Sequence, residues 1–148
     1  MARSMSDSDA RAPLRLLAED ADDLALVAAA LQDAVTKIGD IRYEARARRL
    51  TLTANRYRWE ARESERVRAA LQLGSVLSVQ ARRLRRGAKD AILELLTLGF
   101  EPTDAPGGII TFTFAGGGDL RVTVECLDAI LADVSEPWPT PRIPKHET

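Results

Sequence analysis

Residues 107–125 constrain the fold more than any other stretch of this sequence. Two runs of alternating apolar and polar residues flank a loop at 115–119 that holds three consecutive glycines. Glycine adopts the positive φ angles that reverse a chain at no steric cost, and alternation with period two is typical of a half-buried strand. The stretch therefore predicts a β-hairpin. Because two strands alone are marginally stable in water, its apolar face must pack on the rest of the chain.

Alternating patterns elsewhere predict further strands. A short strand is expected at 14–17, and longer ones at 40–49 and 50–59. Residues 67–84 fit a helix in part, but Val76 and Val79 and the alternation around them favour two strands broken at Gly74 and Ser75. Residues 91–98 and 127–134 fit either a strand or a helix.

One helix is predicted near the N-terminus, over residues 20–35. Asp20, Asp22 and Asp23 supply acceptors and negative charge, which favour the first turn of a helix. Leu24 and Val27 begin a narrow apolar face at helical spacing, which suits packing on a sheet. We expect Gly39 to end this segment or to lie just after it.

The strand at 50–59 contains a conflict of side-chain parity. Leu50 and Leu52 point to the same side as Arg56 and Arg58, whereas the aromatic residues at 57 and 59 have the opposite parity. A β-bulge near residues 54–55 would bury all four apolar side chains together. Without it, the aromatic side chains lie on the side away from the leucines and form a candidate binding surface.

The whole pattern predicts a single α+β domain at residues 13–136. One N-terminal helix packs on a mostly antiparallel, curled sheet of about six or seven strands, as a roll, partial barrel or pleckstrin-homology-like sandwich. Residues 1–12 are small, polar and charged and predict a disordered lead. Residues 137–148 hold four prolines and predict an extended tail.

Composition and charge narrow the classes of protein. The chain is 45% hydrophobic and 29% charged, which is ordinary for a globular domain. No apolar run approaches the roughly 20 residues of a membrane span, and the N-terminus lacks a secretory signal, so we expect a cytoplasmic protein without a membrane partner. The net charge of −1 conceals a middle section, residues 36–90, with a charge of +9. We expect most of these arginines to pair with the acidic flanks, within the fold or between subunits.

Catalytic and metal-binding patterns are not found in the sequence. The single histidine, His146, is third from the end of the chain, and the single cysteine, Cys126, is expected to be a small buried side chain. The acidic residues at 19–23 are better explained as a helix start than as a cation site. The glycines at 116–118 lead into a strand, so a hairpin turn is favoured over a phosphate loop. We therefore expect no catalytic residue, no metal and no cofactor.

The best candidate for binding is a cluster in which arginines alternate with aromatic residues, together with two arginines further along. These candidates are Arg56, Tyr57, Arg58, Trp59, Arg82 and Arg83. The leading hypothesis is a non-catalytic binding or scaffolding module whose arginine-rich face contacts an acidic protein partner or a second copy of the chain. One alternative is a small enzyme that holds an anionic substrate with Arg58 or Arg82 and acts through Asp or Glu. A further alternative is RNA or DNA binding, because such proteins combine guanidinium groups with aromatic stacking.

Several short motifs also suggest a family. They include Glu19 to Leu24, Val76 to Val79, Phe100-Glu101-Pro102, Val124-Glu125-Cys126 and Glu136-Pro137-Trp138. As a set, these motifs resemble a family of short uncharacterised alphaproteobacterial proteins that is classed as a domain of unknown function. The resemblance covers about residues 14–139. It implies a cytoplasmic bacterial protein and supplies no catalytic residue.

Overall fold

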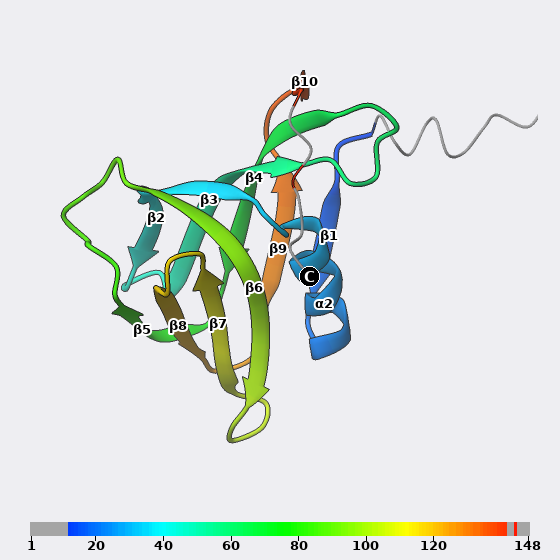
Figure 1. Ribbon diagram of the computed structural model, residues 1–148. Coiled ribbons are helices and arrows are strands. Elements are labelled where there is room, and N and C mark those ends of the chain that lie inside the picture. Colours follow the sequence, from blue (N-terminus) through cyan, green and yellow to red (C-terminus); the bar gives the residue numbers. More distant parts are fainter. Residues whose placement is uncertain (1–11, 142–143, 145–148) are drawn as a thin grey trace, which may run out of the picture.

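The computed structural model describes residues 12–141 and 144 of the chain. This part contains one helix and ten strands (Figure 1). In chain order they are β1 (Arg15–Ala18), α2 (Ala21–Ala30), β2 (Val35–Glu44), β3 (Arg49–Tyr57), β4 (Glu65–Leu73), β5 (Val76–Arg82), β6 (Ile92–Pro102), β7 (Gly108–Phe114), β8 (Asp119–Val124), β9 (Ala129–Asp133) and β10 (Trp138–Pro139).

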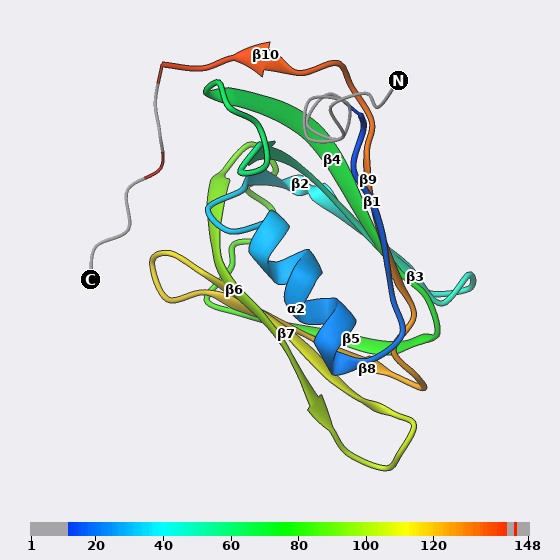
Figure 2. The same ribbon diagram turned by 90° about the vertical axis from the view of Figure 1, so that its right-hand side faces the viewer.

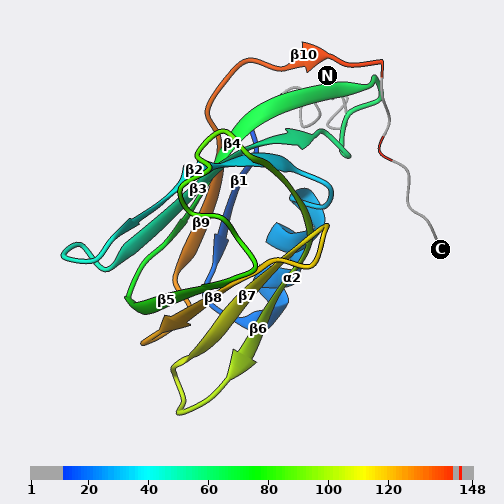
Figure 3. The same ribbon diagram turned by 60° about the vertical axis from the view of Figure 1, so that its left-hand side comes forward.

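The strands form one sheet, and all strand pairs among the described residues are antiparallel. The order along the sheet is β1-β9-β4-β3-β2-β6-β7-β8-β5, and β10 pairs with β4. β2 pairs with β6 only over residues 35–37. Beyond this junction the sheet changes direction, so that β6, β7, β8 and β5 form a second part, set at an angle to the first (Figure 3).

The two parts of the sheet and the helix share one hydrophobic core. The apolar side chains of the predicted hairpin, including Ile110, Phe112 and Phe114 of β7, are buried together with leucines of β3 and β4. The hairpin turn holds Gly116 at φ +92° and Gly117 at φ +95°, as the reversal of the chain requires. The predicted hairpin at 107–125 is therefore confirmed, and its apolar face packs on the rest of the chain.

Helix α2 lies across the open side of the sheet, between β1 and β6 (Figure 2). Its N-cap is Asp20, whose Oδ1 accepts a hydrogen bond of 2.8 Å from the backbone N–H of Asp23. Leu24 and Val27 are its buried residues. The helix ends at Ala30, five residues before the predicted end, because Val35 already pairs with β3 and β6. Gly39, expected at the end of the helical segment, lies inside β2 instead.

The fold class is confirmed, with a larger sheet than predicted. The α+β class, the N-terminal helix and the antiparallel sheet are as expected, but the described residues form ten strands and not six or seven. The segments at 67–75, 91–98 and 127–134, which the sequence left between strand and helix, lie mainly in strands β4, β6 and β9. Residues 45–48, predicted as strand, form the turn between β2 and β3.

The ends of the chain are described only in part. The predicted disordered lead lies outside the described residues except for Ala12. In the predicted tail, Trp138 and Pro139 form β10, which pairs with Arg66 and Glu65 of β4. Within the described residues, no helix is long and apolar enough to cross a membrane.

Candidate functional site

Arg56 continues the buried face of β3. Burial alternates along this strand from Leu50 and Leu52 to Arg56, which is 0% exposed. The register between β3 and β4 is continuous, so β3 has no bulge near residues 54–55; the irregularity lies in β2, between Thr36 and Ile41. The parity read from the sequence is therefore correct, and of the two alternatives it left open, the strand without a bulge is the one observed. An arginine takes the inward position after the leucines.

The guanidinium group of Arg56 forms five hydrogen bonds, which matches its five N–H donors. Its Nε and Nη2 donate to the two carboxylate oxygens of Asp133, at 2.8 and 2.9 Å. Its Nη1 and Nη2 donate to the carboxylate of Glu60, at 3.0 and 2.7 Å, and Nη1 also donates to the carbonyl of Tyr57. Asp133 Oδ2 accepts a further bond from the backbone N–H of Leu14. The cluster thus joins β3, the end of β9, the residue before β1 and the loop after β3.

These contacts shift the ionisation of both partners. Burial alone lowers the pKa of the Arg56 guanidinium, but the hydrogen bonds and charges of Glu60 and Asp133 outweigh burial and raise this pKa. Burial alone raises the pKa of the Glu60 carboxyl, but the hydrogen bond and charge of Arg56, with smaller help from Arg58, lower it. Both groups are therefore charged at neutral pH, as a buried ion pair requires.

Arg58 anchors the other side of the same loop. Its backbone N–H donates to the carbonyl of Glu65 at 2.9 Å, and its guanidinium donates to the Glu65 carboxylate. It also lies 3.8 Å from Glu60. The Arg58 side chain is 4% exposed. Arg56 and Arg58 therefore both use their charge within the fold.

The two aromatic candidates pack on the same loop. The rings of Tyr57 and Trp59 meet edge to face, with centroids 4.7 Å apart. The Tyr57 hydroxyl lies 3.2 Å from the hydroxyl of Ser64, and Arg66 lies over the Tyr57 ring. Trp59 Nε1 donates to the carbonyl of Gln32, beyond the end of α2. Tyr57 is buried and Trp59 remains 38% exposed, so the cluster contributes mainly to packing.

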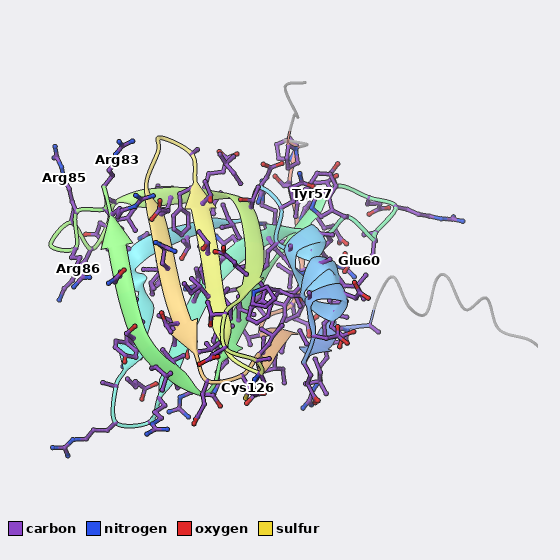
Figure 4. All side chains as sticks on the ribbon, turned by 90° about the horizontal axis from the view of Figure 1, so that it is seen from below. Tyr57, Glu60, Arg83, Arg85, Arg86 and Cys126 are labelled. Carbon is purple, nitrogen blue, oxygen red and sulfur yellow. The ribbon has the colours of Figure 1, made fainter. Side chains whose placement is uncertain are left out.

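Arg82 and Arg83 lie far from this cluster. In Figure 4, Arg83 is at one end of the molecule, and Tyr57 and Glu60 are at the other. Arg82 pairs with Asp119 at 2.6 Å across the β5–β8 ladder. The hydrogen bond from Arg82 is the main reason that the pKa of Asp119 is lowered, and the charges of Arg121 and Arg83 add to it. The six candidates from the sequence thus form two separate groups.

The connection between β5 and β6, residues 83–91, forms a basic loop. Its four cations are Arg83, Arg85, Arg86 and Lys89, and all four are exposed. None of them forms an ion pair within the described part of the chain. The labelled arginines of this loop project outward from the body of the protein (Figure 4).

The basic loop is held at both of its ends. At the β8 side it lies directly on Gly118, where a Cβ atom would come within 2.4 Å of the Leu84 side chain and 3.0 Å of the Arg83 carbonyl. At the β2 side the N–H of Gly39 donates to the carbonyl of Lys89 at 2.8 Å. The loop is therefore attached to both parts of the sheet.

A cavity of about 350 Å³ lies beside the basic loop. Its apolar lining comes from β2, β3, β5, β8 and Leu84 of the basic loop, and two cations of the loop complete it. The lining residues are Ile38, Gly39, Ile41, Tyr43, Leu50, Val79, Ala81, Leu84, Arg86, Lys89 and Leu120. The lining residues include two cations and no carboxylate.

Sequence reasoning did not find this cavity. The sequence showed only the positive charge of residues 36–90, to which the cations of the basic loop contribute. Residues 40–49 and the segment with Val79 and Ala81 were predicted as separate strands, and Gly39 was placed at or just after the end of the predicted helix. The missing information is that these two strands face each other, which depends on pairings between residues far apart in the sequence.

Metal ligands and thiol chemistry add no site in the described residues. No group of three or more His, Cys, Asp or Glu side chains that could hold a metal occurs within residues 12–141 and 144. Cys126 is half-buried, with its sulfur 3.6 Å from the Ser75 hydroxyl. His146 lies outside the described residues.

Comparison with known proteins identifies the family but no function. No curated protein and no solved structure matches the chain. One family model does, over residues 14–146, and its description is "Protein of unknown function (DUF2948)". This confirms the predicted resemblance to a domain of unknown function, whereas the alphaproteobacterial, cytoplasmic origin stays a prediction. Since the match spans almost the whole chain, the protein belongs to the DUF2948 family.

Proposed function

We propose that this protein is a non-catalytic binding module that holds an anionic group at the basic loop. The observation that carries the proposal is the concentration of four exposed cations, without ion pairs among the described residues, on one connection that borders a cavity. Like charges at close spacing repel one another, and an anion relieves that repulsion. The loop therefore gains most from a negatively charged ligand or partner.

The rest of the molecule makes this loop distinctive. The net charge of the chain is −1, so the protein as a whole does not attract anions. Arg56 and Arg58 are neutralised by Asp133, Glu60 and Glu65. A local positive surface on a protein of nearly zero net charge directs a negative ligand to one place.

The two alternatives have less support. An enzyme that works through Arg and Asp or Glu needs both kinds of group around one cavity, and the cavity beside the basic loop is lined by two cations and no carboxylate. RNA or DNA binding was suggested by the aromatic and guanidinium groups at 56–59. Arg56, Tyr57 and Arg58 are buried, so they offer little surface for base stacking. Both alternatives stay predictions.

Chromatography on immobilised heparin, a sulfated polyanion, tests the proposal. We expect the wild-type protein to be retained at low ionic strength and eluted by salt, because salt screens exposed charges. The variant Arg83→Gln/Arg85→Gln/Arg86→Gln/Lys89→Gln should lose retention completely.

A matched variant removes the same charge elsewhere. Lys37→Gln/Arg42→Gln/Arg46→Gln/Arg62→Gln changes four exposed cations outside the loop, and it should elute close to the wild type. If the wild-type protein passes through the column, or if both variants lose retention equally, the basic loop is not the anion site.

A further inference from the structure

The cavity beside the basic loop lies at an opening in the wall of the sheet. β5 is the last strand of the sheet path and pairs with β8. The pairing of β2 with β6 ends at residue 37. Among the described residues, residues 41–44 of β2 pair only with β3. The outer edges of these two segments therefore face each other without pairing. We call this opening the seam, and the basic loop crosses it on the way from β5 to β6 (Figure 1).

The seam gives access to the hydrophobic core. Leu50 and Leu120, which line the cavity, belong to the core cluster and are 0% and 4% exposed. Ile41, Val79 and Ala81 are partly buried around them. An apolar group placed on these side chains would be removed from water, which contributes roughly 25 cal/mol per Å² of buried apolar area.

The rim of the cavity has the opposite character. Arg86 and Lys89 lie at the loop side, exposed to solvent, and Tyr43 is 40% exposed on β2. Cations at the mouth of an apolar cavity favour a ligand whose negative group remains at the surface while its apolar part is buried. The cationic rim and the apolar lining therefore fit an amphiphilic ligand, which has one anionic end and one apolar end.

We propose that the seam cavity binds a small anionic amphiphile, with its apolar body on Leu50 and Leu120 and its single anionic head group at Arg86 and Lys89. This inference rests on the proposed function, since it names the class of ligand that the basic loop holds. The ligand is a free molecule with one carboxylate or similar head, and its apolar tail supplies most of the buried area.

The dimensions of the seam favour a small molecule over an extended peptide. A volume of about 350 Å³ falls within the range of small-molecule sites. Both ends of the seam are closed by backbone hydrogen bonds, from Val76 N–H to the Arg48 carbonyl at 2.9 Å and from Gly39 N–H to the Lys89 carbonyl at 2.8 Å. A peptide strand that paired with β2 and β5 would have to pass through these closed ends.

Decanoate is a suitable probe, used below its micelle concentration. In ¹H–¹⁵N correlation spectra of the full chain, we expect saturable shifts centred on the amides of Ile41, Val79 and Ala81. Decanol has a similar tail without the charge, and acetate has the head without the tail, so both should bind at least about tenfold more weakly. Decanol binding as tight as decanoate, or shifts centred elsewhere, would overturn the proposal.

Two pairs of variants locate the head and the tail. Arg86→Gln/Lys89→Gln should weaken decanoate binding about tenfold or more, whereas Arg46→Gln/Arg62→Gln removes equal charge from exposed positions outside the loop and the cavity and should stay within about twofold. Ala81→Phe fills the cavity and should abolish binding. Gln80→Phe places the same ring on the opposite, exposed side of β5 and should preserve it. Ala81→Leu replaces Ala81→Phe if the latter does not fold.

The outcomes separate this inference from the proposed function. If the wild-type protein binds heparin through the basic loop but does not bind decanoate, the loop is an anion site and the amphiphile is wrong. If neither binds, both proposals fail. Equal decanoate affinity of Arg86→Gln/Lys89→Gln and Arg46→Gln/Arg62→Gln removes the head-group assignment. Sedimentation with phosphatidylglycerol vesicles that depends on Arg86 and Lys89 would show that the ligand is a bilayer lipid and not a free molecule.

Discussion

The arginines at the end of β3 and the arginines of the basic loop lie at opposite ends of the molecule, marked by Glu60 and Arg85 in Figure 4. In the sequence the two groups look alike, as short runs dense in arginine. In the structure Arg56 is fully buried, and Arg85 is exposed. The difference lies in the acidic partners within reach. Asp133, Glu60 and Glu65 surround the first group, and no ion pair is formed by the basic loop among the described residues.

The two groups of arginines use the same side chain in two ways. A buried guanidinium is stable only when its donors are satisfied, so Arg56 holds strands and loop in one arrangement and cannot exchange its partners without unfolding. An exposed guanidinium keeps its water and can exchange it for a ligand. Arginine content alone therefore does not predict a binding face, and the position of the carboxylates after folding decides which arginines remain for binding.

Arg56→Met tests whether the buried arginine stabilises the fold. We expect a loss of about 3–5 kcal/mol in the free energy of unfolding, because the variant leaves the carboxylate of Asp133 buried without its cation. Urea denaturation followed by circular dichroism measures it. Arg83→Met, on the basic loop, should change the same quantity by no more than about 0.5 kcal/mol.

A double variant identifies the physical cause. Arg56→Met/Asp133→Leu removes both buried charges, so it should recover much of the stability that Arg56→Met loses. The recovery stays incomplete because Asp133 also accepts a bond from the Leu14 N–H. A loss for Arg56→Met no larger than that for Arg83→Met would mean that burial does not distinguish the two groups of arginines.

The pH dependence of stability tests the pairing of Glu60 with Arg56. Its pKa in the folded protein is lowered, so its pairing with Arg56 stabilises the fold above the ordinary glutamate pKa of about 4.3, and this contribution is lost as the pH falls through the lowered value. Glu60→Gln should therefore cost roughly 1–2 kcal/mol at neutral pH, because the amide loses the charge and one of the two acceptor oxygens, and much less in acid.

Urea denaturation at a series of pH values measures this difference. Glu63→Gln is the matched control, because Glu63 lies in the same loop, is exposed and forms no ion pair within the described residues. Its stability should follow the wild type across the range. A Glu60→Gln variant whose deficit is unchanged from neutral to acidic pH would show that the carboxylate charge is not what stabilises the loop.

Local patterns in the sequence predicted most of the fold. The hairpin at 107–125 and the strands around Gly74 follow from period-two alternation, and Asp20 marks the helix start because a cap uses only neighbouring residues. The helix end was missed because Val35 is taken into β2 by partners at residues 55 and 94. The strand count was too low partly because β10 is two residues long and exists through its pairing with β4.

The sequence did not predict which arginines are buried or where the cavity lies. Parity placed Arg56 beside the leucines of β3, yet its burial depends on Asp133, which is 77 residues away. The seam cavity likewise requires β2 and β5 to lie opposite each other with no strand between them. Neither arrangement leaves a signal in one segment, since each is produced by packing between distant segments.

Arg82 shares a feature with each group: it is paired with a carboxylate, that of Asp119, but its side chain is 69% exposed. Arg82→Gln should raise the pKa of the Asp119 carboxyl toward its ordinary value, because the Arg82 hydrogen bond is the main cause that lowers it. Arg83→Gln should raise it less, since Arg83 acts through its charge alone. Carboxyl ¹³C titration by NMR measures both.

Water replaces an exposed partner, so the urea midpoint of Arg82→Gln should move far less than that of Arg56→Met. Equal movement of the two midpoints would mean that pairing, whatever the exposure, makes an arginine structural, and only arginines without any carboxylate partner would then remain for binding.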